Sequence, residues 1–216
     1  MFEPLRVDVA ERLTAAKEFF AATHIVGGNA STAVKGLVFV SIYAAYEHMV
    51  RTAVQMTIST LSAKKYRLKN LSVPLLSIFL DAELQSIRTC SDDRLWRHRI
   101  NLFEKVFSTD LAATGTKLMP TDGTHYRYSN LQVIFSALGI KSSSNNQHLK
   151  RMLRIDEVVE NRNKIAHGRE TPEQIGGVYT HDDILDRIDH VENICRTFLN
   201  RIERFCKNSV LHKRKR

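Results

Sequence analysis

The chain has 216 residues, of which 43% are hydrophobic and 25% are charged, the balance of an ordinary soluble globular protein. Its three cysteines form neither a CxxC pair nor an even framework, which excludes a disulfide scaffold and favours a reducing compartment. The formal charge of +9 predicts attraction to polyanions, and phosphate backbones are the commonest polyanions in a cell.

The first predicted element is an amphipathic helix near the N-terminus, because its apolar residues recur every three or four positions. These residues are Leu5, Val9, Leu13, Ala16 and Phe20. A break at Gly27-Gly28-Asn29 precedes a second helix, predicted over 31–61. That helix is apolar nearly all round, which indicates burial among other helices.

No segment of the sequence reads as a membrane span or a signal peptide. The most apolar stretch, 36–58, is interrupted by charged and polar residues, and the N-terminus is amphipathic. We therefore expect a cytoplasmic protein that has no membrane partner.

The middle of the chain predicts three shorter helices and a long loop. Pro74 opens a helix over 73–89, and Ser91 is the expected N-cap of another that runs to about 107. Residues 108–128 are loop-like, and a short helix over 130–138 ends at Gly139.

Two long helices complete the chain. The first runs over 147–167 and ends at Gly168, a residue typical of the position just after a helix. The second begins with a capping box formed by Thr180 and Asp183. Its apolar stripe is Ile184, Ile188, Val191, Cys195, Phe198, Ile202 and Phe205. Cys195 and Cys206 are interpreted as small core residues.

The pattern as a whole predicts an all-α fold, a helical bundle with additional helices and a long central loop. No strand-like alternation of useful length, internal repeat or domain boundary is evident. We predict a single domain over 1–210, followed by a basic tail, 211–216, that we expect to be disordered.

An arginine within the apolar arc of the 147–167 helix requires an explanation, because a guanidinium stays charged and its burial demands a partner. Arg162 falls near the middle of the arc that contains Ile155, Val158 and Val159. One interpretation is a structural ion pair with Glu47, in the middle of the second helix. The other is that the arc lines an interface or cleft where Arg162 meets a phosphate.

The segment Arg162-Asn163-Lys164-Ile165-Ala166-His167-Gly168 resembles the signature of the HEPN superfamily, an Arg followed after four residues by His, with a polar residue directly after the Arg. The motif ends a long helix in the C-terminal part of a helical bundle, as it does in that family. The upstream segment Tyr43-Ala44-Ala45-Tyr46-Glu47 is similar to the second helix of many HEPN proteins. The most similar type is the RiboL-PSP HEPN nuclease of bacterial defence loci.

The resemblance implies an HEPN-like fold and a metal-independent endoribonuclease that needs no cofactor. Its catalytic residues would be Arg162, His167 and Asn163, with Glu47 in a supporting role that positions Arg162. The substrate would be RNA such as tRNA or mRNA, and the product ends a 2′,3′-cyclic phosphate and a 5′-hydroxyl. The family pattern implies a homodimer with a composite active site and a role as a toxin or phage-defence effector, with an antitoxin or defence protein as a further partner.

Other basic and aromatic residues are candidates for RNA binding. Lys164 and Arg169 add positive charge beside the motif, and Tyr126 and Arg127 could stack on and pair with bases from a loop. A loop folded back onto the bundle explains Tyr126 and Arg127 equally well.

A metal site is the weaker interpretation of the acidic and histidine residues that begin the last helix. These residues are His181, Asp182, Asp183, Asp186, Asp189 and His190. Acidic residues are expected in the first turn of a helix, and no HExxH is present, so we predict no metal. The alternatives to a nuclease are a catalytically silent HEPN module that binds RNA or mediates dimerisation, and a plain helical scaffold.

Overall fold

The structure, a computed structural model, describes residues 1–22, 27–112, 126–141 and 146–208, with the backbone alone for 146–153. Most of the predicted loop and the whole of the basic tail lie in residues 113–125, 142–145 and 209–216, outside the described residues. Within the described ranges the chain is helical, apart from one isolated bridge between Arg67 and Leu111. The all-α prediction is confirmed.

The chain divides into two compact units, which are described separately. The first unit comprises residues 1–53, 125–131 and 143–201, and the second comprises 54–124, 132–142 and 202–216. The single domain predicted over 1–210 stays a prediction. In the described ranges, no helix combines the length and the apolar character that crossing a membrane requires.

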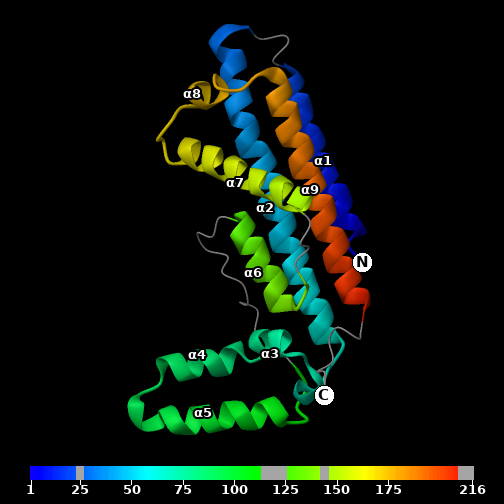
Figure 1. Ribbon diagram of the computed structural model, residues 1–216, viewed down its shortest axis with the longest axis vertical. Coiled ribbons are helices and arrows are strands. Elements are labelled where there is room, and N and C mark those ends of the chain that lie inside the picture. Colours follow the sequence, from blue (N-terminus) through cyan, green and yellow to red (C-terminus); the bar gives the residue numbers. More distant parts are fainter. Residues whose placement is uncertain (23–26, 113–125, 142–145, 209–216) are drawn as a thin grey trace. The chain divides into compact units, whose positions relative to one another are not determined.

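The first unit is built on three long helices that run alongside one another (Figure 1). They are α1 (Glu3–Ala21), the first part of α2 (Gly28–Ala63) and most of α9 (His181–Lys207). Asp8 of α1 pairs with His48 of α2 at 2.6 Å, and Lys17 of α1 pairs with Glu192 of α9 at 2.8 Å. The unit also contains α7 (Asn146–Ala166) and the short α8 (Pro172–Gly176).

The periodic stripes of α1 and α9 form much of the core, as the spacing of their apolar residues predicts. Every residue of the predicted α1 stripe is at most 5% exposed, and the α9 stripe is buried from Ile184 to Phe205. The capping box at the start of α9 is also confirmed. The Asp183 amide donates to Thr180 Oγ1 at 3.1 Å, and the Thr180 amide donates to Asp183 Oδ2 at 3.0 Å.

The short α8, which was not predicted from the sequence, packs backbone to backbone against α2. A Cβ on Gly176 would lie 1.9 Å from the Thr32 carbonyl oxygen, and a Cβ on Gly36 would lie 2.1 Å from that of Pro172. No side chain larger than hydrogen fits at either position. Two glycines therefore fix where the chain runs between the α7 motif and α9.

The second unit holds the end of α2, the 3-10 turn η2 (Leu68–Asn70), α3 (Val73–Phe79), α4 (Asp81–Thr89), α5 (Asp92–Phe107), most of α6 (Tyr128–Leu138) and the last turns of α9. Its core gathers around α3 and α6. The fully or nearly fully buried residues include Leu71, Leu75, Ile134, Phe135, Leu138, Ile202 and Phe205.

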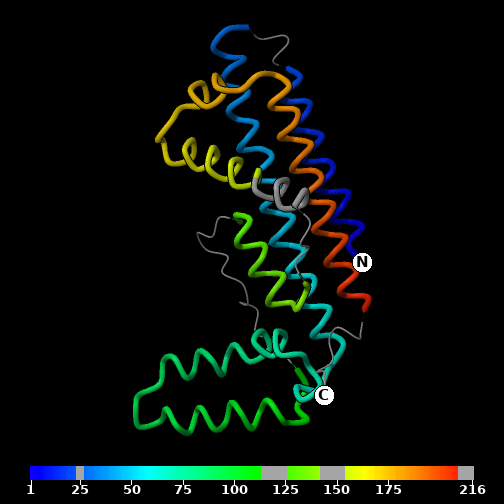
Figure 2. The backbone as a smooth tube through the Cα atoms, viewed as in Figure 1, coloured from blue at the N-terminus to red at the C-terminus, as the bar shows by residue number. Residues whose placement is uncertain are grey.

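Two details of this unit differ from the sequence prediction. The helix predicted over 73–89 is two helices (Figure 2), because the backbone leaves helical geometry at Leu80 (φ −107°, ψ 19°). The Leu80 side chain stays buried. Ser91 occupies the N-cap position of α5, but its side chain accepts no capping hydrogen bond from the helix. Its hydroxyl instead accepts from Arg94 Nε at 3.2 Å.

Candidate functional site

The predicted motif lies at the C-terminal end of α7, where the chain reverses at Gly168. That glycine has φ +64°, the left-handed conformation that favours glycine. The Gly168 amide donates to the Ile165 carbonyl at 3.1 Å, and the Arg169 amide donates to the Lys164 carbonyl at 2.9 Å. These two bonds form a complete Schellman cap. They fix His167 at the helix end, where it is exposed.

Arg162 is half-buried and is held by contacts other than an ion pair. Its guanidinium carbon lies 4.8 Å from the centre of the Tyr43 ring, and its Nη1 donates to Asn163 Oδ1 at 3.0 Å. Asn163 is 6% exposed, so this acceptor is held in place. Among the described residues, no carboxylate forms a salt bridge with Arg162. Most of its N–H donors therefore remain available for an anion.

The predicted ion pair between Glu47 and Arg162 is not formed, which corrects that expectation. Glu47 accepts from Arg51 at 3.5 Å instead. Residues four apart on a helix face the same side, so Arg51 competes for Glu47 within α2 itself. Glu47 is thus placed near the site without holding the guanidinium directly.

Tyr43 is a site residue that sequence reasoning missed. Its side chain is 1% exposed. Burial raises the pKa of Tyr43 and Glu47 raises it further, whereas an interaction of the hydroxyl with the Tyr126 main chain and the Arg162 charge oppose the rise. Tyr43 therefore senses both charges. Its position one helical turn before Glu47 in α2 could have indicated that it lies near the site.

A network of polar side chains that the sequence did not predict joins α7 to α9. Asn161, 7% exposed, donates to the Tyr179 hydroxyl at 2.7 Å, which in turn donates to Glu157 at 2.9 Å. Glu157 also accepts two hydrogen bonds from Arg187, each at 3.1 Å. Such a satisfied, partly buried network holds the helix that carries the motif in one orientation.

Three of the four residues predicted to bind RNA, Arg127, Lys164 and Arg169, lie close enough to Glu160 for their charges to lower the pKa of its carboxyl. Arg169 is exposed, but Lys164 pairs with Glu170 at 2.7 Å, across the turn that ends α7. Arg127 pairs with Glu160 at 2.6 Å, and its charge lowers the pKa of that carboxyl. Arg169 is thus the member of the set whose side chain is most open to an incoming phosphate.

Tyr126 is 4% exposed, so its ring is not available to stack on a base, which corrects that expectation. Its carbonyl accepts a hydrogen bond from the buried Tyr46 hydroxyl at 2.8 Å. The chain at this point is packed onto the first unit, which is the alternative that the sequence left open.

Two of the acidic residues near the start of α9, Asp183 and Asp186, are paired with arginines. Arg187 lies 3.0 Å from Asp186 and 3.7 Å from Asp183, and Arg154 also pairs with Asp186. Among the described residues, no group of three or more His, Cys, Asp and Glu side chains could hold a metal ion.

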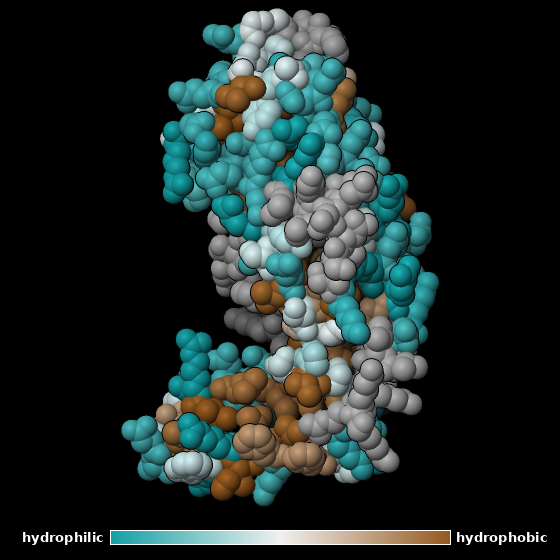
Figure 3. All heavy atoms as spheres, in the orientation of Figure 1, coloured by the Kyte–Doolittle hydropathy of each residue, from teal (hydrophilic) through white to brown (hydrophobic). Residues whose placement is uncertain are grey.

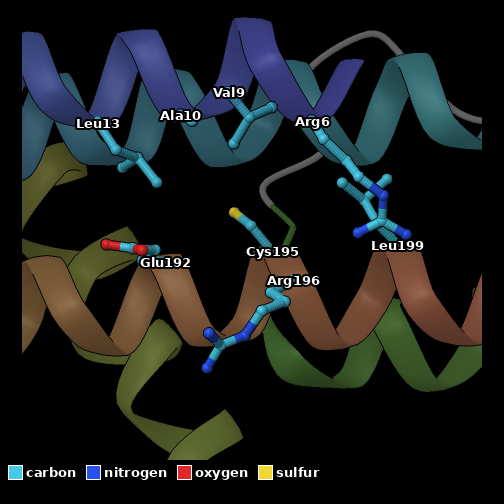
Figure 4. A pocket seen from close by; sticks show the side chains of 8 residues that line it. All are labelled: Arg6, Val9, Ala10, Leu13, Glu192, Cys195, Arg196 and Leu199. Atoms are coloured by element: carbon cyan, nitrogen blue, oxygen red, sulfur yellow. The ribbon is translucent and has the colours of Figure 1, made fainter. Parts of the chain in front are cut away.

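A groove in the first unit lies between α1 and α9 and contains none of the motif residues (Figure 4). Val9, Ala10 and Leu13 of α1 line it opposite Cys195 and Leu199 of α9. Burial raises the pKa of Cys195 to about 12, so the thiolate that reactivity requires is scarce. The groove adds no reactive group to the motif.

The family model described as HEPN_MAE_28990-like HEPN matches residues 3–210. No curated protein and no solved structure matches the chain. The match covers nearly the whole sequence, including both units and the Arg162–His167 motif, so the chain belongs to the HEPN family.

Proposed function

We propose that this protein is a metal-independent endoribonuclease that acts as a toxin or phage-defence effector. The observation that carries the proposal is the state of Arg162, a half-buried arginine stacked on Tyr43 with no carboxylate partner among the described residues. A structural arginine at this depth would be expected to carry an ion pair. A phosphate of the substrate supplies the missing negative charge.

Each motif residue then has a defined task. Arg162 binds the scissile phosphate and stabilises the extra negative charge of the transition state. Asn163 Oδ1 orients the guanidinium through the hydrogen bond described above. Tyr43 supports the guanidinium with its ring face.

His167 performs the proton transfers, because an imidazole exchanges protons near neutral pH. One imidazole removes the 2′-hydroxyl proton, and the 2′-oxygen attacks phosphorus. The bond to the 5′-oxygen breaks, and a second imidazole gives that oxygen a proton. A 2′,3′-cyclic phosphate and a 5′-hydroxyl result. The second imidazole comes from another copy of the chain, whose motif faces the first.

Because His167 is exposed, its replacement should leave the fold intact, so a loss of cleavage can be assigned to the missing imidazole. Purified protein is incubated with tRNA and mRNA in EDTA, and the ends are mapped. We expect cyclic-phosphate ends from the wild type and, for His167→Ala and Arg162→Ala, a loss of roughly 10² or more in cleavage rate. Arg12→Ala, an exposed arginine of α1 that lies outside the motif, is the matched control and should lose far less.

Two results would contradict the proposal. One is cleavage that disappears in EDTA, and the other is cleavage that survives in His167→Ala. Tight RNA binding without cleavage would support the alternative, a catalytically silent HEPN module. Mixing the two inactive variants tests the composite site, because a mixed pair in which each copy supplies what the other lacks should recover part of the activity.

A further inference from the structure

Three basic side chains converge on one carboxylate, that of Glu160 on the polar face of α7. Arg127 Nη2 donates to Glu160 Oε2 at 2.6 Å. This contact lowers the pKa of the carboxyl most, and the charges of Lys164 and Arg169 lower it further. Positive charge is in excess here, even though Lys164 also pairs with Glu170. Figure 3 shows mainly hydrophilic residues over the C-terminal part of α7.

The main chain on either side of Arg127 is held without the help of its ion pair. The Tyr128 amide donates to Asp156 Oδ1 at 2.7 Å, and the Tyr126 carbonyl accepts a hydrogen bond from a buried tyrosine of α2 at 2.8 Å. The Arg127 side chain is 39% exposed and that of Glu160 is 43% exposed. A pair exposed to this extent adds little to stability. The guanidinium can therefore exchange the carboxylate for another anion without disturbing the fold.

The ion pair lies on the same face of α7 as His167 and away from Arg162. Glu160, Lys164 and His167 recur at steps of four and three, which places them on one face of the helix. Arg162 follows Glu160 by two residues, so it projects about 160° away around the helix axis. Along the axis Glu160 lies about 10 Å from His167, which one nucleic-acid strand spans in roughly three nucleotides or fewer. An anion that replaces Glu160 is therefore distinct from the one bound by Arg162.

We propose that the three basic side chains bind a second phosphate of the RNA, a few nucleotides from the scissile one, and that this phosphate displaces Glu160. The identity of the anion rests on the ribonuclease proposed above. A phosphate accepts several N–H donors at once, and a guanidinium binds it through paired hydrogen bonds. Until RNA binds, Glu160 keeps the Arg127 side chain in place. The protein would then favour strands that continue past the scissile bond over dinucleotides.

Binding of an uncleavable strand tests this phosphate site apart from any chemistry. The probe is a fluorescent 2′-O-methyl oligoribonucleotide of about ten nucleotides, since its blocked 2′-oxygen cannot attack phosphorus. The dissociation constant is measured by fluorescence anisotropy at several salt concentrations. Arg127→Gln should raise it about three- to tenfold and reduce the slope of its logarithm against that of the salt concentration by about 0.7, as expected for one lost phosphate contact. Glu160→Gln should lower it several-fold, because the competing negative charge is gone.

Arg12→Gln is the matched control for the loss of one positive charge. Arg12 is also an exposed arginine paired with a carboxylate, that of Asp8 at 3.0 Å, but it belongs to α1. Because exposed charges farther apart than about 10 Å are largely screened at moderate salt, its replacement should change the dissociation constant by less than about twofold.

Cleavage of a strand with one reactive bond locates the second phosphate. A DNA strand that contains a single ribonucleotide has one 2′-hydroxyl, and each of the other phosphates is replaced in turn by a neutral methylphosphonate. We expect one replacement, within a few nucleotides of the ribonucleotide, to lower kcat/KM of the wild type about three- to tenfold. The same replacement should have no further effect in Arg127→Gln, because the contact is already lost.

Several results would overturn the proposal. They are equal effects of Arg127→Gln and Arg12→Gln, RNA binding that Glu160→Gln leaves unchanged or weakens, and methylphosphonate effects that are the same in the wild type and in Arg127→Gln. The two proposals also fail separately. Cleavage with none of these effects removes the second phosphate site alone, whereas the binding effects without cleavage support that site and remove the nuclease.

Discussion

The end of α7 and the α4–α5 hairpin show two opposite ways of using a helix. At the end of α7, aromatic and charged groups are tied to the core, since Arg162 stacks on a tyrosine that is 1% exposed. On α5, aromatic residues of the same size are exposed to solvent by more than half. Buried groups hold a chemical site in place, whereas exposed apolar groups are typical of surfaces that bind another molecule. The two regions should therefore respond differently to substitution.

A large effect is expected in the first unit, at the contact between α8 and α2. Gly176→Ala places a methyl group 1.9 Å from the Thr32 carbonyl and 2.8 Å from the Gly36 nitrogen, and both are backbone atoms that a rotamer change cannot move. We expect a loss of about 3 kcal/mol in the free energy of unfolding, measured by urea denaturation. Gly27→Ala, which would meet nothing within 4 Å, is the control and should change it by less than about 0.5 kcal/mol. Equal stability of the two variants would show that α8 is not packed as described.

A pair of phenylalanines compares the two regions directly. Phe39 is 0% exposed and Phe103 is 64% exposed. Phe39→Ala should cost about 3–5 kcal/mol, because it removes a core side chain and leaves a cavity. Phe103→Ala, measured at low protein concentration, should cost less than about 0.5 kcal/mol. A large loss of stability for Phe103→Ala would contradict this comparison, since the Phe103 side chain would then be packed within the chain.

The polar network of α7 should contribute a smaller amount. Glu157→Gln removes the charge that Arg187 contacts through two hydrogen bonds, and the Arg187 side chain is 15% exposed. We expect a loss of roughly 1–2 kcal/mol by thermal unfolding. Glu192→Gln breaks the exposed pair with Lys17 and should cost under about 0.5 kcal/mol. Similar losses for both would mean that the network around Glu157 is no stronger than a surface ion pair.

A further comparison concerns pH and one thiol from each unit. Burial raises the pKa of Cys195 from 9.0 to about 12, so the folded protein keeps a proton that the unfolded chain releases. The resulting stability is fully present below pH 9 and is lost as the pH rises toward 12. Burial also raises the pKa of Cys206, but a hydrogen bond from Thr57 and the Lys64 charge oppose it.

Removing each thiol should therefore flatten the alkaline fall in stability to a different degree. Urea denaturation at several pH values above 9 gives the slope for Cys195→Ala, Cys206→Ala and the wild type. A single thiol changes that slope by at most about 1.4 kcal/mol per pH unit. We expect the greater change for Cys195→Ala, and the reverse order would count against the burial described for the first unit.

The features that the sequence predicted best are those with a long period or a local hydrogen-bond code. The α1 and α9 stripes, the Thr180–Asp183 capping box and the left-handed Gly168 each follow from residues close together in the chain. The all-α fold follows from the same patterns.

Features that depend on tertiary packing could not be read in this way. No glycine or proline marks the break at Leu80, and α8 has five residues, too few to show a period. The contact of Tyr43 with Arg162 joins residues far apart in sequence. Glu47 was the expected partner of Arg162 because it carries the opposite charge. It pairs instead with Arg51, which lies one turn away in the same helix.

The cap at Gly168 holds the motif in position through the main chain, without help from the side chains around it. Its two hydrogen bonds join main-chain atoms, so the reversal after His167 depends on one glycine and on none of the neighbouring side chains. Lys164, Arg169 and Glu170 can therefore be exchanged during evolution without disturbing the helix end. Substitutions at these three positions should therefore change the surroundings of the motif without moving it.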